Sequence, residues 1–528
     1  MNPLAKFQYL GLAQTLRKYL LKTERALNRR VRKPPPFPQQ DAAIDLHLTL
    51  LGHEFDLHSP NRWHRSPDTG KTWPLLYSHA IPLDAAGDVK LVWELNRHQF
   101  LPTLAEKDPD LTRRILRDWI AQNPYEFGIN WNSALEVGLR LISWLETFEK
   151  VPSMREEFSD SLAQHHRFIR HHLSSDWIPR GNHLVGEAAA LSLSEGKPHP
   201  WLVQAATEQF FESGVHREQS VAYHRFVTHL FALGGLPQPK ALAYLAAIRQ
   251  PDGSLPMVGD NDDGRASSRP LELPPAPLTS AAFPDAGHYV LRDGGNYCFV
   301  RCGEFGLPPT HSHGHADLLS PVLWLQGKPI FVDAGTFTYN GDARWRRHFR
   351  SAHAHNVVTV DERDYAEQTG TFSWSHPPRG ICESWTGREF CGSHDAYRDL
   401  GITVRRRFAY SDGAFTITDT VEGSGQHRLR WRFHLHPDLK ITRCGADGFE
   451  LGGNHVLEVH APWRASLPAS RIGGGSAGAS PSNSRIIPAK LSVGQGWHSP
   501  SYGQRIAVKV CEISLDAALP VTAEFKLR

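Results

Sequence analysis

The sequence predicts a two-domain α+β protein, in which a helical half is followed by an antiparallel β half. Its 528 residues are more than one ordinary hydrophobic core holds. Apolar residues recur at helical spacing up to about residue 265, and from residue 288 they alternate in short runs. The proline-rich segment 265–287 separates the two patterns. We therefore expect a leader over residues 1–34, a helical domain over 35–270 and a β domain over 271–528.

Composition excludes several classes of protein. Hydrophobic residues make up 40% of the chain and include 15 Trp, which excludes a disordered or collagen-like chain. The formal net charge of +3 gives no argument for a nucleic-acid partner, and none is expected. No apolar run reaches the length of about 18 residues that a membrane-spanning helix needs. The six cysteines form no CxxC pair, whereas the 30 histidines suggest proton transfer or metal binding.

Residues 1–33 form a basic leader. They hold nine Lys and Arg and a single acid, Glu24, with apolar residues at roughly helical spacing. One interpretation is a basic helix docked on the protein's own acidic body, and we favour it. The other is contact of residues 7–33 with a membrane surface. A secretion signal is not expected, because no uninterrupted apolar region precedes a small-residue cleavage site.

Local patterns predict the elements of both domains. Ala-, Leu- and Arg-rich segments bounded by Pro and Gly predict helices over residues 110–122, 133–150, 158–173, 183–194, 201–213 and 221–233. Apolar residues nearly surround the helix at 133–150, so we expect it inside a multi-helix toroid or bundle. Alternating runs predict a large antiparallel sandwich, with strands over 288–292, 297–301, 329–333, 356–361, 402–410, 414–420, 427–436 and 505–513.

The segment 310–317 is the most informative one for function. It places His311, His313, His315 and Asp317 at every second position, so the four side chains would share one face of an extended segment. Burying three imidazoles and a carboxylate without partners is costly. The cluster is therefore expected to be hydrated, metal-bound or catalytic, and strand-end residues that merely face water are the alternative.

Two further polar residues stand at the ends of predicted strands. Asp333 ends an apolar strand and His355 begins another. A His, an Asp and a His from adjacent strands would make a plausible zinc site with an oxygen ligand. The helical half offers a matching set in Asn182-His183 and Tyr223-His224. A helix cap would explain Asn182 alone, and Tyr223 by itself would more often be a core residue.

Taken in order, these motifs resemble the heparinase II/III family of polysaccharide lyases over nearly the whole chain. Each motif is weak alone, and their ordered occurrence across the change from helices to strands carries the resemblance. The landmarks are Asn61-Arg62-Trp63-His64, Thr72-Trp73-Pro74, Trp93-Glu94-Leu95-Asn96-Arg97, Asn123-Pro124, Gly128-Ile129-Asn130-Trp131-Asn132, Glu136, Arg140, Gly181-Asn182-His183, Tyr223-His224, His313-Gly314-His315-Ala316-Asp317, Asp333 and His355-Asn356.

The resemblance implies an incomplete α/α toroid followed by a large antiparallel β-sandwich. It also implies β-elimination on a uronate-containing, acidic polysaccharide, which leaves a 4,5-unsaturated sugar. Asn182 and His183 would then neutralise the uronate carboxylate, and Tyr223 would be the acid, and also the base when both positions lie on one side of the ring. His313 would be the base or a carboxylate neutraliser. The accessory candidates are His224, Arg225 and Tyr339.

The resemblance also implies one structural zinc ion and no organic cofactor, with His315, Asp333 and His355 as the ligands. Aromatic and arginine side chains suit sugar faces and carboxylates, so a set of conspicuous residues in the helical half could line a sugar groove. They are Trp93, Asn96, Arg97, Asn130, Trp131, Glu136 and Arg140. The alternative is packing between helices for the tryptophans, and an i,i+4 pair for Glu136 and Arg140.

Two other functions stay open at this point. Relatives with the Trp-Glu-Leu-Asn-Arg motif often accompany bacterial exopolysaccharide systems. The chain could therefore be a non-catalytic carbohydrate-binding or polymer-handling protein of exopolysaccharide synthesis, although it holds Asn182, Tyr223 and His313 together. A zinc hydrolase built on residues 311–317 is less favoured, because the helix-borne glutamate beside paired histidines is missing.

Overall fold

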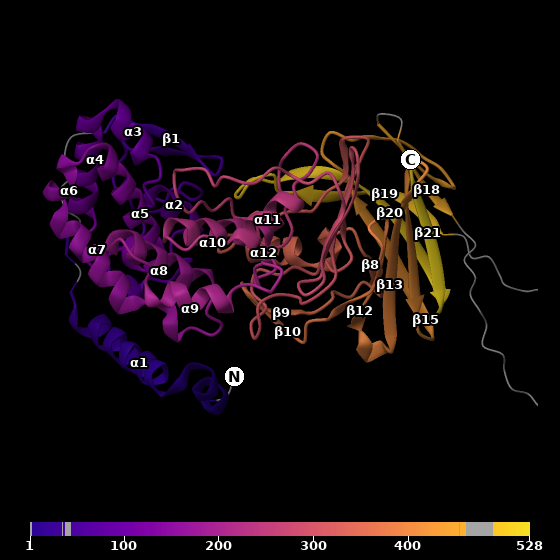
Figure 1. Ribbon diagram of the computed structural model, residues 1–528, viewed down its shortest axis with the longest axis horizontal. Helices are drawn as coiled ribbons and strands as arrows, with labels where there is room; N and C mark the ends of the chain where they lie inside the picture. Colours follow the sequence, from indigo (N-terminus) through magenta and orange to yellow (C-terminus); the bar gives the residue numbers. More distant parts are fainter. Residues whose placement is uncertain (1–2, 34, 37–43, 453–454, 461–488) are drawn as a thin grey trace, which may run out of the picture.

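The computed structural model describes residues 3–33, 35–36, 44–452, 455–460 and 489–528, with side chains from residue 13 onward. A helical domain and a β domain lie side by side along the long axis, and a separate helix runs along one edge (Figure 1). The predicted fold class, a helical toroid followed by a β-sandwich, is confirmed. Among the described helices, none combines the length and the apolar character that crossing a membrane requires.

The basic leader is one long helix, α1 (Pro3–Val31), docked on the helical domain. Arg17 donates to the carbonyl oxygens of Leu173 at 2.9 Å and His171 at 2.7 Å. Lys18 donates to the carbonyl of Asp176 at 3.0 Å. Docking of the leader on the body is thus confirmed, while the side chains of residues 7–12 lie outside the described residues.

The helical domain begins with a hairpin, β1 (His47–Leu50) and β2 (His53–Asp56), and the short turn η1 (Ser78–Ala80). Its first helices are α2 (Val89–Asn96), α3 (Leu101–Lys107) and α4 (Pro109–Gln122), followed by the turn η2 (Ile129–Trp131). Then come α5 (Ala134–Lys150), α6 (Ser153–Glu157), α7 (Ser159–His172) and the turn η3 (Ser174–Asp176). The last are α8 (Asn182–Glu195), α9 (Pro200–Glu208), α10 (Val221–Leu233) and α11 (Pro239–Ala247). All six predicted helices are present.

Helix α5 organises this domain. It is buried along almost its whole length and contacts α3, α7 and α8. The expected all-round apolar helix is therefore found, and its burial explains why polar residues face inward only where they have partners. Helix α10 starts at a serine cap, where the Ser220 hydroxyl accepts a hydrogen bond from the Tyr223 amide at 3.1 Å. This cap fixes the first turn, from which Tyr223 projects.

The β domain opens with β3 (Ala281–Phe283), β4 (His288–Asp293), β5 (Asn296–Arg301), β6 (Pro321–Leu325) and β7 (Lys328–Phe331). Helix α12 (Ala343–Arg350) and the turn η4 (Ala352–Ala354) precede β8 (Val358–Val360), β9 (Glu367–Gly370) and β10 (Ser373–Ser375). Then come β11 (Gly380–Trp385), β12 (Glu389–Tyr397), the turn η5 (Arg398–Leu400), β13 (Ile402–Ser411), β14 (Ala414–Glu422) and β15 (Gln426–His434). The last are β16 (Ile441–Cys444), β17 (Gly448–Leu451), β18 (His455–His460), β19 (Lys490–His498), β20 (Ile506–Ala518) and β21 (Val521–Leu527).

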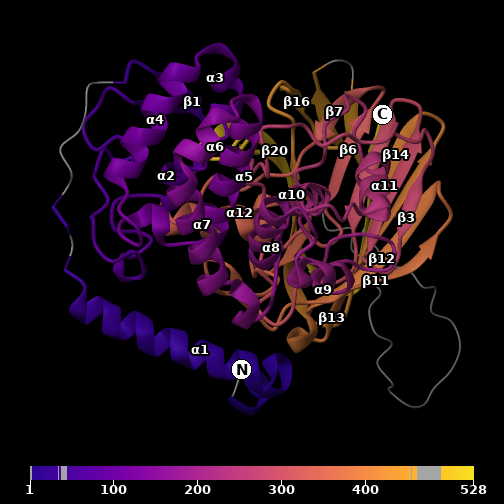
Figure 2. The ribbon, with the colours of Figure 1, turned by 60° about the vertical axis from the view of Figure 1, so that its left-hand side comes forward.

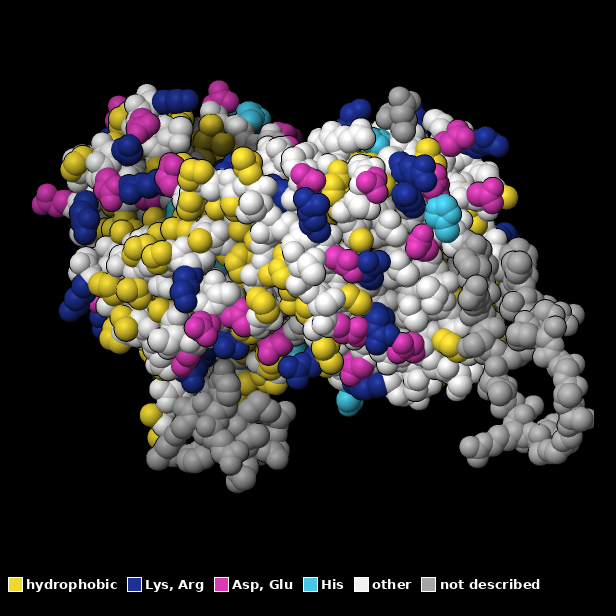
Figure 3. All heavy atoms as spheres, turned by 45° about the vertical axis from the view of Figure 1, so that its right-hand side comes forward, with side chains coloured by type: hydrophobic (Ala, Val, Ile, Leu, Met, Phe, Trp, Pro, Cys, Tyr) yellow, Lys and Arg dark blue, Asp and Glu magenta, His cyan; other side chains and the backbone are white. Residues whose placement is uncertain are grey.

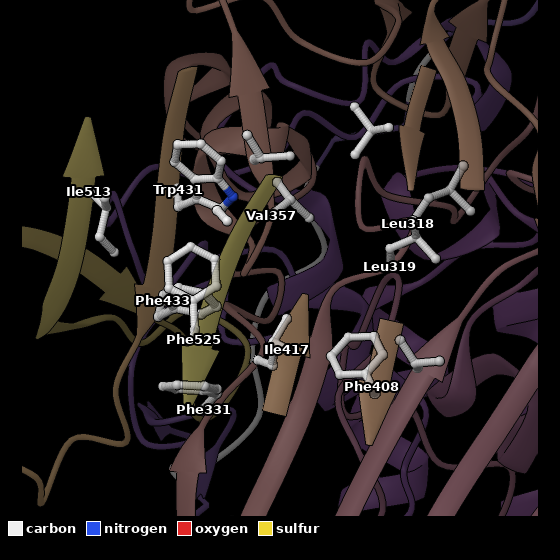
Figure 4. Packing of buried hydrophobic residues seen from close by; sticks show 14 of the residues in the cluster. Leu318, Leu319, Phe331, Val357, Phe408, Ile417, Trp431, Phe433, Ile513 and Phe525 are labelled. Atoms are coloured by element: carbon white, nitrogen blue, oxygen red, sulfur yellow. The ribbon is translucent and has the colours of Figure 1, made fainter. Parts of the chain in front are cut away.

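These strands form three larger sheets in which every described pairing is antiparallel. Their strand orders are β11-β12-β13-β14-β21-β18-β17-β16, β19-β20-β15-β8 and β3-β4-β5-β6-β7. Alternating burial along β21 shows one face turned to the core, as period-two patterning predicts. Between the sheets Trp431, Phe433 and Phe525 pack near Phe408 and Ile417 (Figure 4). Each buried aromatic side chain stabilises the sandwich by about 2 kcal/mol.

The segment at 310–317 is not a strand, contrary to the expectation. His311 and His313 have φ values of +56° and +65°, which turn the chain at both positions. Gly314 packs so closely on Phe305 that a Cβ atom would lie 1.8 Å from the carbonyl oxygen. The histidines therefore do not share one face of a strand. Asp317 forms its ion pair with Arg301.

Candidate active site

A cavity of about 530 Å³ lies where the helical domain meets loops of the β domain. Helices α2, α5, α8 and α10 supply one side, and the segments around residues 262, 312, 339 and 372 supply the other. Sequence-predicted residues that line the cavity are Trp93, Arg97, Glu136, Asn182, His183, Tyr223, His313 and Tyr339. We call Asn182, His183, Tyr223 and His313 the open corner of this cavity.

Tyr223 and His313 form the centre of the open corner. Their rings stack with centroids 3.9 Å apart, although they come from different domains. The Tyr223 hydroxyl lies 3.2 Å from the Tyr339 hydroxyl and donates weakly to Asp262 Oδ2 at 3.4 Å. Burial raises the pKa of the Tyr223 phenol well above its ordinary value, and the carboxylates of Asp262 and Asp260 raise it further. Tyr223 is therefore a neutral phenol that can donate a proton.

Asp260 holds His313 in place. His313 Nδ1 donates to Asp260 Oδ2 at 3.0 Å, which leaves Nε2 directed at Asn182 Nδ2, 3.5 Å away. The same carboxylate accepts hydrogen bonds from His315 and Arg346. Burial alone would raise the pKa of Asp260, but Arg346 and the two histidines hold it well below its ordinary value. An ionised Asp260 thus orients the imidazole so that Nε2 can accept a proton.

Sequence reasoning missed Asp260. It lies in the acid-rich turn 260–263, which belongs to no periodic segment. Gly259, with φ +69°, brings this turn against the His313 backbone, where a Cβ atom would lie 2.8 Å from the His313 carbonyl oxygen. The sequence did contain one signal for this turn: Gly259 is followed by Asp260, Asp262 and Asp263 just before the change from helices to strands.

Glu218 positions Asn182, and it was also missed. Its carboxylate accepts the Asn182 backbone amide at 3.0 Å and the side-chain Nδ2 at 3.0 and 3.1 Å. A Cβ atom at position 181 would lie 2.2 Å from Glu218 Oε1, so glycine there lets this carboxylate approach Asn182 closely. Within the described residues Asn182 Oδ1 is buried without a hydrogen-bond partner. Asn182 Nδ2 is therefore held between Glu218 and His313, and the unpartnered atom of its amide is the acceptor Oδ1.

His183 and Trp177 form the outer rim of the open corner. Their ring centroids are 4.8 Å apart, and Trp177 is 45% exposed. Burial lowers the pKa of His183 to about 4, so the imidazole is neutral near pH 7. An exposed tryptophan at a cavity mouth offers a flat apolar face of the kind on which sugars stack. Trp177 carried no motif and was not predicted.

Another part of the cavity lining carries paired charges. Lys90, Arg97 and Glu136 line the cavity and Glu94 pairs with Lys90 and Arg97, and we call these four residues the paired wall. Arg97 donates to both Glu136 oxygens, at 2.7 and 2.8 Å, and to Glu94 at 2.8 Å. Lys90 Nζ lies 2.8 Å from Glu94 and 3.3 Å from Asp262. Burial would raise the pKa of Glu136, but Arg97 lowers it below its ordinary value. Arg97 and Glu136 line the cavity as a pair, and Glu136 pairs with Arg97 and not with Arg140.

Helix α1 closes one end of the cavity. Arg25, His79 and His172 all line this end. Arg25 forms a hydrogen bond with His172 Nδ1 at 3.2 Å, and its Nε has no partner among the described residues. Lys90 and Arg97 have carboxylate partners, whereas Arg25 is the cavity-lining cation that forms no ion pair in the described part of the chain.

Several predicted residues lie elsewhere. Asn96, Asn130, Trp131 and Arg140 are at most 1% exposed and belong to the helical core. Arg140 stacks on Trp119 at 4.3 Å and donates to the carbonyls of Asn96 and Asn130. Their arrangement is that of inter-helix packing, and none of the four lines the cavity.

Two accessory candidates also point away from the cavity. His224 bonds the Ala241 carbonyl at 2.9 Å and accepts the His216 amide at 3.0 Å, so it ties α10 to its neighbours. Arg225 lines a separate cavity beside the hairpin β1–β2. Tyr339 is the accessory candidate that reaches Tyr223. Its backbone amide donates to Tyr502 at 2.6 Å and to Asp88 at 3.2 Å, which anchors the loop that carries it.

The three predicted zinc ligands are neighbours beneath the open corner. His355 Nδ1 lies 3.2 Å from Asp333 Oδ2, and the rings of His315 and His355 are 5.4 Å apart. His315 Nδ1 and both His355 nitrogens are buried without hydrogen-bond partners among the described residues. No group of three or more His, Cys, Asp or Glu in the described part of the chain has the arrangement of a metal site. The donor types suit zinc, but their present positions do not form a coordination sphere.

The fold and cavity define a two-domain protein in which a helical toroid and a β-sandwich share one polar cleft. Residues 275–520 match the family described as Heparinase II/III-like, C-terminal. The chain is 23% identical over 478 residues to a heparin-sulfate lyase of Bacteroides stercoris, covering 71% of this chain and 69% of that protein. The β domain is therefore similar to the heparinase II/III-like C-terminal family, and the resemblance predicted from the motifs is confirmed.

Solved structures show the same fold. A crystal structure of heparinase III superposes with a TM-score of 0.62 at 15% identity, covering 99% of this chain and 90% of that chain. A mutant heparan sulfate lyase of Pedobacter heparinus gives a TM-score of 0.53 at 18% identity, covering 99% and 89%. The toroid and the sandwich are thus arranged as in these proteins.

Proposed function

We propose that this protein is a polysaccharide lyase that cleaves an acidic, uronate-containing polysaccharide by β-elimination. The observation that carries the proposal is the stacked pair of Tyr223 and His313, in which each side chain has its own supporting carboxylate. A proton donor and a proton acceptor stand together in one cleft, and β-elimination needs one of each. The name of the matched relative, a heparin-sulfate lyase, supports the same class and puts glycosaminoglycans first among the substrates.

The reaction assigns a role to each side chain of the open corner. For Asn182 to neutralise the substrate carboxylate, its Nδ2 must exchange a hydrogen bond with Glu218 for one with that carboxylate, which then makes the C5 proton more acidic by stabilising the developing negative charge. His313 Nε2 removes that proton, because Asp260 holds Nδ1 as the protonated nitrogen. The electron pair forms the C4–C5 double bond and the bond from C4 to O4 breaks. Tyr223 then donates its hydroxyl proton to the departing O4.

The environment of Tyr223 favours its role as acid over its role as base. A base would have to be a phenolate, and burial together with Asp262 and Asp260 raises the pKa of this phenol. Tyr339, 3.2 Å away, can pass a proton back to Tyr223 after the reaction. His183 is neutral, so it contributes an N–H donor or a lone pair and not a positive charge.

We also propose a structural zinc ion held by His315, Asp333 and His355. Support comes from His315 Nδ1 and His355 Nε2, which are buried without hydrogen-bond partners among the described residues. A zinc ion there would supply positive charge beneath His313 and link three loops, while the proton transfers stay with the residues of the open corner. Metal analysis of purified protein tests this: about one zinc per chain is expected, and His355→Ala should lose it. Protein purified without any bound metal, yet fully folded, contradicts the proposal.

A panel of polysaccharides tests the lyase proposal. Purified protein is mixed with heparan sulfate, heparin, chondroitin sulfate, hyaluronan, alginate and bacterial exopolysaccharides. We expect rising ultraviolet absorbance from the new conjugated double bond and products with the mass of unsaturated oligosaccharides. Binding without any absorbance change would instead support a non-catalytic carbohydrate-binding protein. Products that contain an added water would support a hydrolase.

A further inference from the structure

The outward face of α1 is apolar, although the helix is already docked on the protein by its other face. Leu16 and Tyr19 are each 58% exposed, Leu20 and Val31 are each 65% exposed, and Leu27 is 60% exposed. At 100° per residue these five side chains fall on one stripe, about 22 Å long. Leu21, on the opposite side, is only 7% exposed and packs against the body.

Basic side chains lie within the stripe and to its side: by the same 100° rule Arg30 falls within it, Lys22 lies about 130° from its centre, and Lys33 follows the end of the helix. Lys22, Arg30 and Lys33 are exposed, and in the part of the chain that the structure describes none of them forms an ion pair. The one acid of the helix, Glu24, is bound to His171 at 2.9 Å on the side of the protein body. The outward face therefore combines long apolar side chains with cations and has no acid among its described residues.

The position of α1 leaves this face accessible. The helix forms the lower edge of the molecule in two views turned by 60°, and no other described element lies beneath it (Figures 1 and 2). Inner-face contacts, such as Arg17 with Leu173 and Lys18 with Asp176, fix its direction. A surface that meets the lower edge would meet the apolar stripe along the helix.

We propose that α1 is an interfacial helix that holds the protein on an anionic lipid surface. The apolar stripe would enter the boundary between headgroups and acyl chains, and the long basic side chains beside it would reach the phosphates. A lipid surface fits this face better than a protein groove, because the stripe is straight, convex and lined by flexible cations. The helix is already ordered by docking, so lipid binding carries no cost of folding it.

Co-sedimentation with vesicles tests this inference independently of any lyase activity. Full-length protein is mixed with vesicles of phosphatidylglycerol and phosphatidylcholine, or of phosphatidylcholine alone. We expect sedimentation with the anionic vesicles only, and release at high salt. The combined variant Leu16→Ser/Leu20→Ser/Leu27→Ser should bind at least about a hundredfold more weakly. Lys22→Glu/Arg30→Glu should bind at least about twenty-fold more weakly.

Matched controls come from exposed residues far from α1. Leu278 is 86% exposed and Lys197 is exposed, so Leu278→Ser and Lys197→Glu should leave sedimentation unchanged. Urea unfolding of every variant confirms that the fold is retained. Wild-type protein that stays in the supernatant, equal binding to both kinds of vesicle, or full binding by the triple serine variant would each overturn the proposal. A dimer in light scattering that only the serine variant loses, without vesicle binding, would assign the face to a second copy of the chain.

Discussion

The paired wall and the open corner belong to one cavity, yet they differ in what their polar groups can still do. In the paired wall Arg97 donates its hydrogen bonds to Glu136 and Glu94. In the open corner Tyr223 has only long hydrogen bonds, and Asn182 Oδ1 has no partner among the described residues. Breaking a buried ion pair to bind a ligand is costly, whereas an unsatisfied group gains from binding. Lining a cavity therefore does not by itself make a residue a ligand for the substrate.

The distribution of surface charge also bears on how an acidic substrate is held. On the face shown in Figure 3, Lys and Arg side chains are interspersed with Asp and Glu, without a large patch of one sign. The formal net charge of +3 is also small for a chain of 528 residues. An acidic polymer must then be held by individual groups in the cavity and not by the overall field. The predictions below test which groups these are.

Replacing Tyr223 by Phe should have the largest effect. The variant loses the proton donor for O4, so we expect kcat to fall by about a thousandfold. Because the Tyr223 hydroxyl bonds are long, the free energy of unfolding should change by less than about 1 kcal/mol. The rate of ultraviolet absorbance change measures the first quantity and urea unfolding the second. Tyr365→Phe, a buried tyrosine of the sandwich, is the matched control and should keep full activity. Activity retained by Tyr223→Phe would remove Tyr223 from the mechanism.

Replacing Arg97 by Gln should act on stability instead. The change leaves Glu136 and Glu94 buried without their main partner, so the free energy of unfolding should fall by about 3–5 kcal/mol. Urea unfolding measures this loss. Arg117→Gln removes an ion pair with Glu157 whose arginine is 62% exposed, and it should cost less than about 1 kcal/mol. If Arg97→Gln is as stable as wild type but has a raised KM, then Arg97 binds substrate. The contrast between the paired wall and the open corner would then be wrong.

Replacing Arg25 by Gln should have a smaller effect, which concerns substrate binding. Arg25 is the cavity-lining cation that forms no ion pair in the described part of the chain, at the end closed by α1. On the substrate that the panel identifies, Arg25→Gln should raise KM by about tenfold and leave kcat unchanged, because one charge-assisted hydrogen bond is lost. Arg30→Gln, on the outward face of the same helix, should change neither constant. An unchanged KM for Arg25→Gln would show that the anionic groups bind elsewhere.

Helices and strands could be predicted from the sequence better than the tertiary contacts between residues. Helices α5, α8 and α10 follow from apolar periodicity, which depends only on local spacing. His313 was identified, but its alternating segment resembled a strand, and the positive φ values at positions 311 and 313 come from tertiary packing around Gly314. Asp260 and Glu218 lie outside periodic segments, and their roles depend on contacts with residues far away along the chain. A polar side chain can bind substrate only if no other residue already satisfies its hydrogen bonds. Which residue lies beside it depends on the tertiary fold.

His183 gives the last and smallest effect, which concerns pH. Its pKa is lowered to about 4 by burial, whereas an unfolded histidine has a pKa of about 6.5. Between these values the unfolded chain binds a proton that the folded chain does not, so stability falls as the pH is lowered from about 6.5 to about 4. The paired wall should not contribute in this window, because the pKa of Glu136 is lowered and that of Lys90 is raised. His183→Gln should therefore lose less stability than wild type between about pH 7 and about pH 5 in urea unfolding. His47→Gln, whose side chain is 65% exposed, should lose as much as wild type. An equal loss in wild type and His183→Gln would mean that His183 is accessible to solvent and protonates freely in the folded protein.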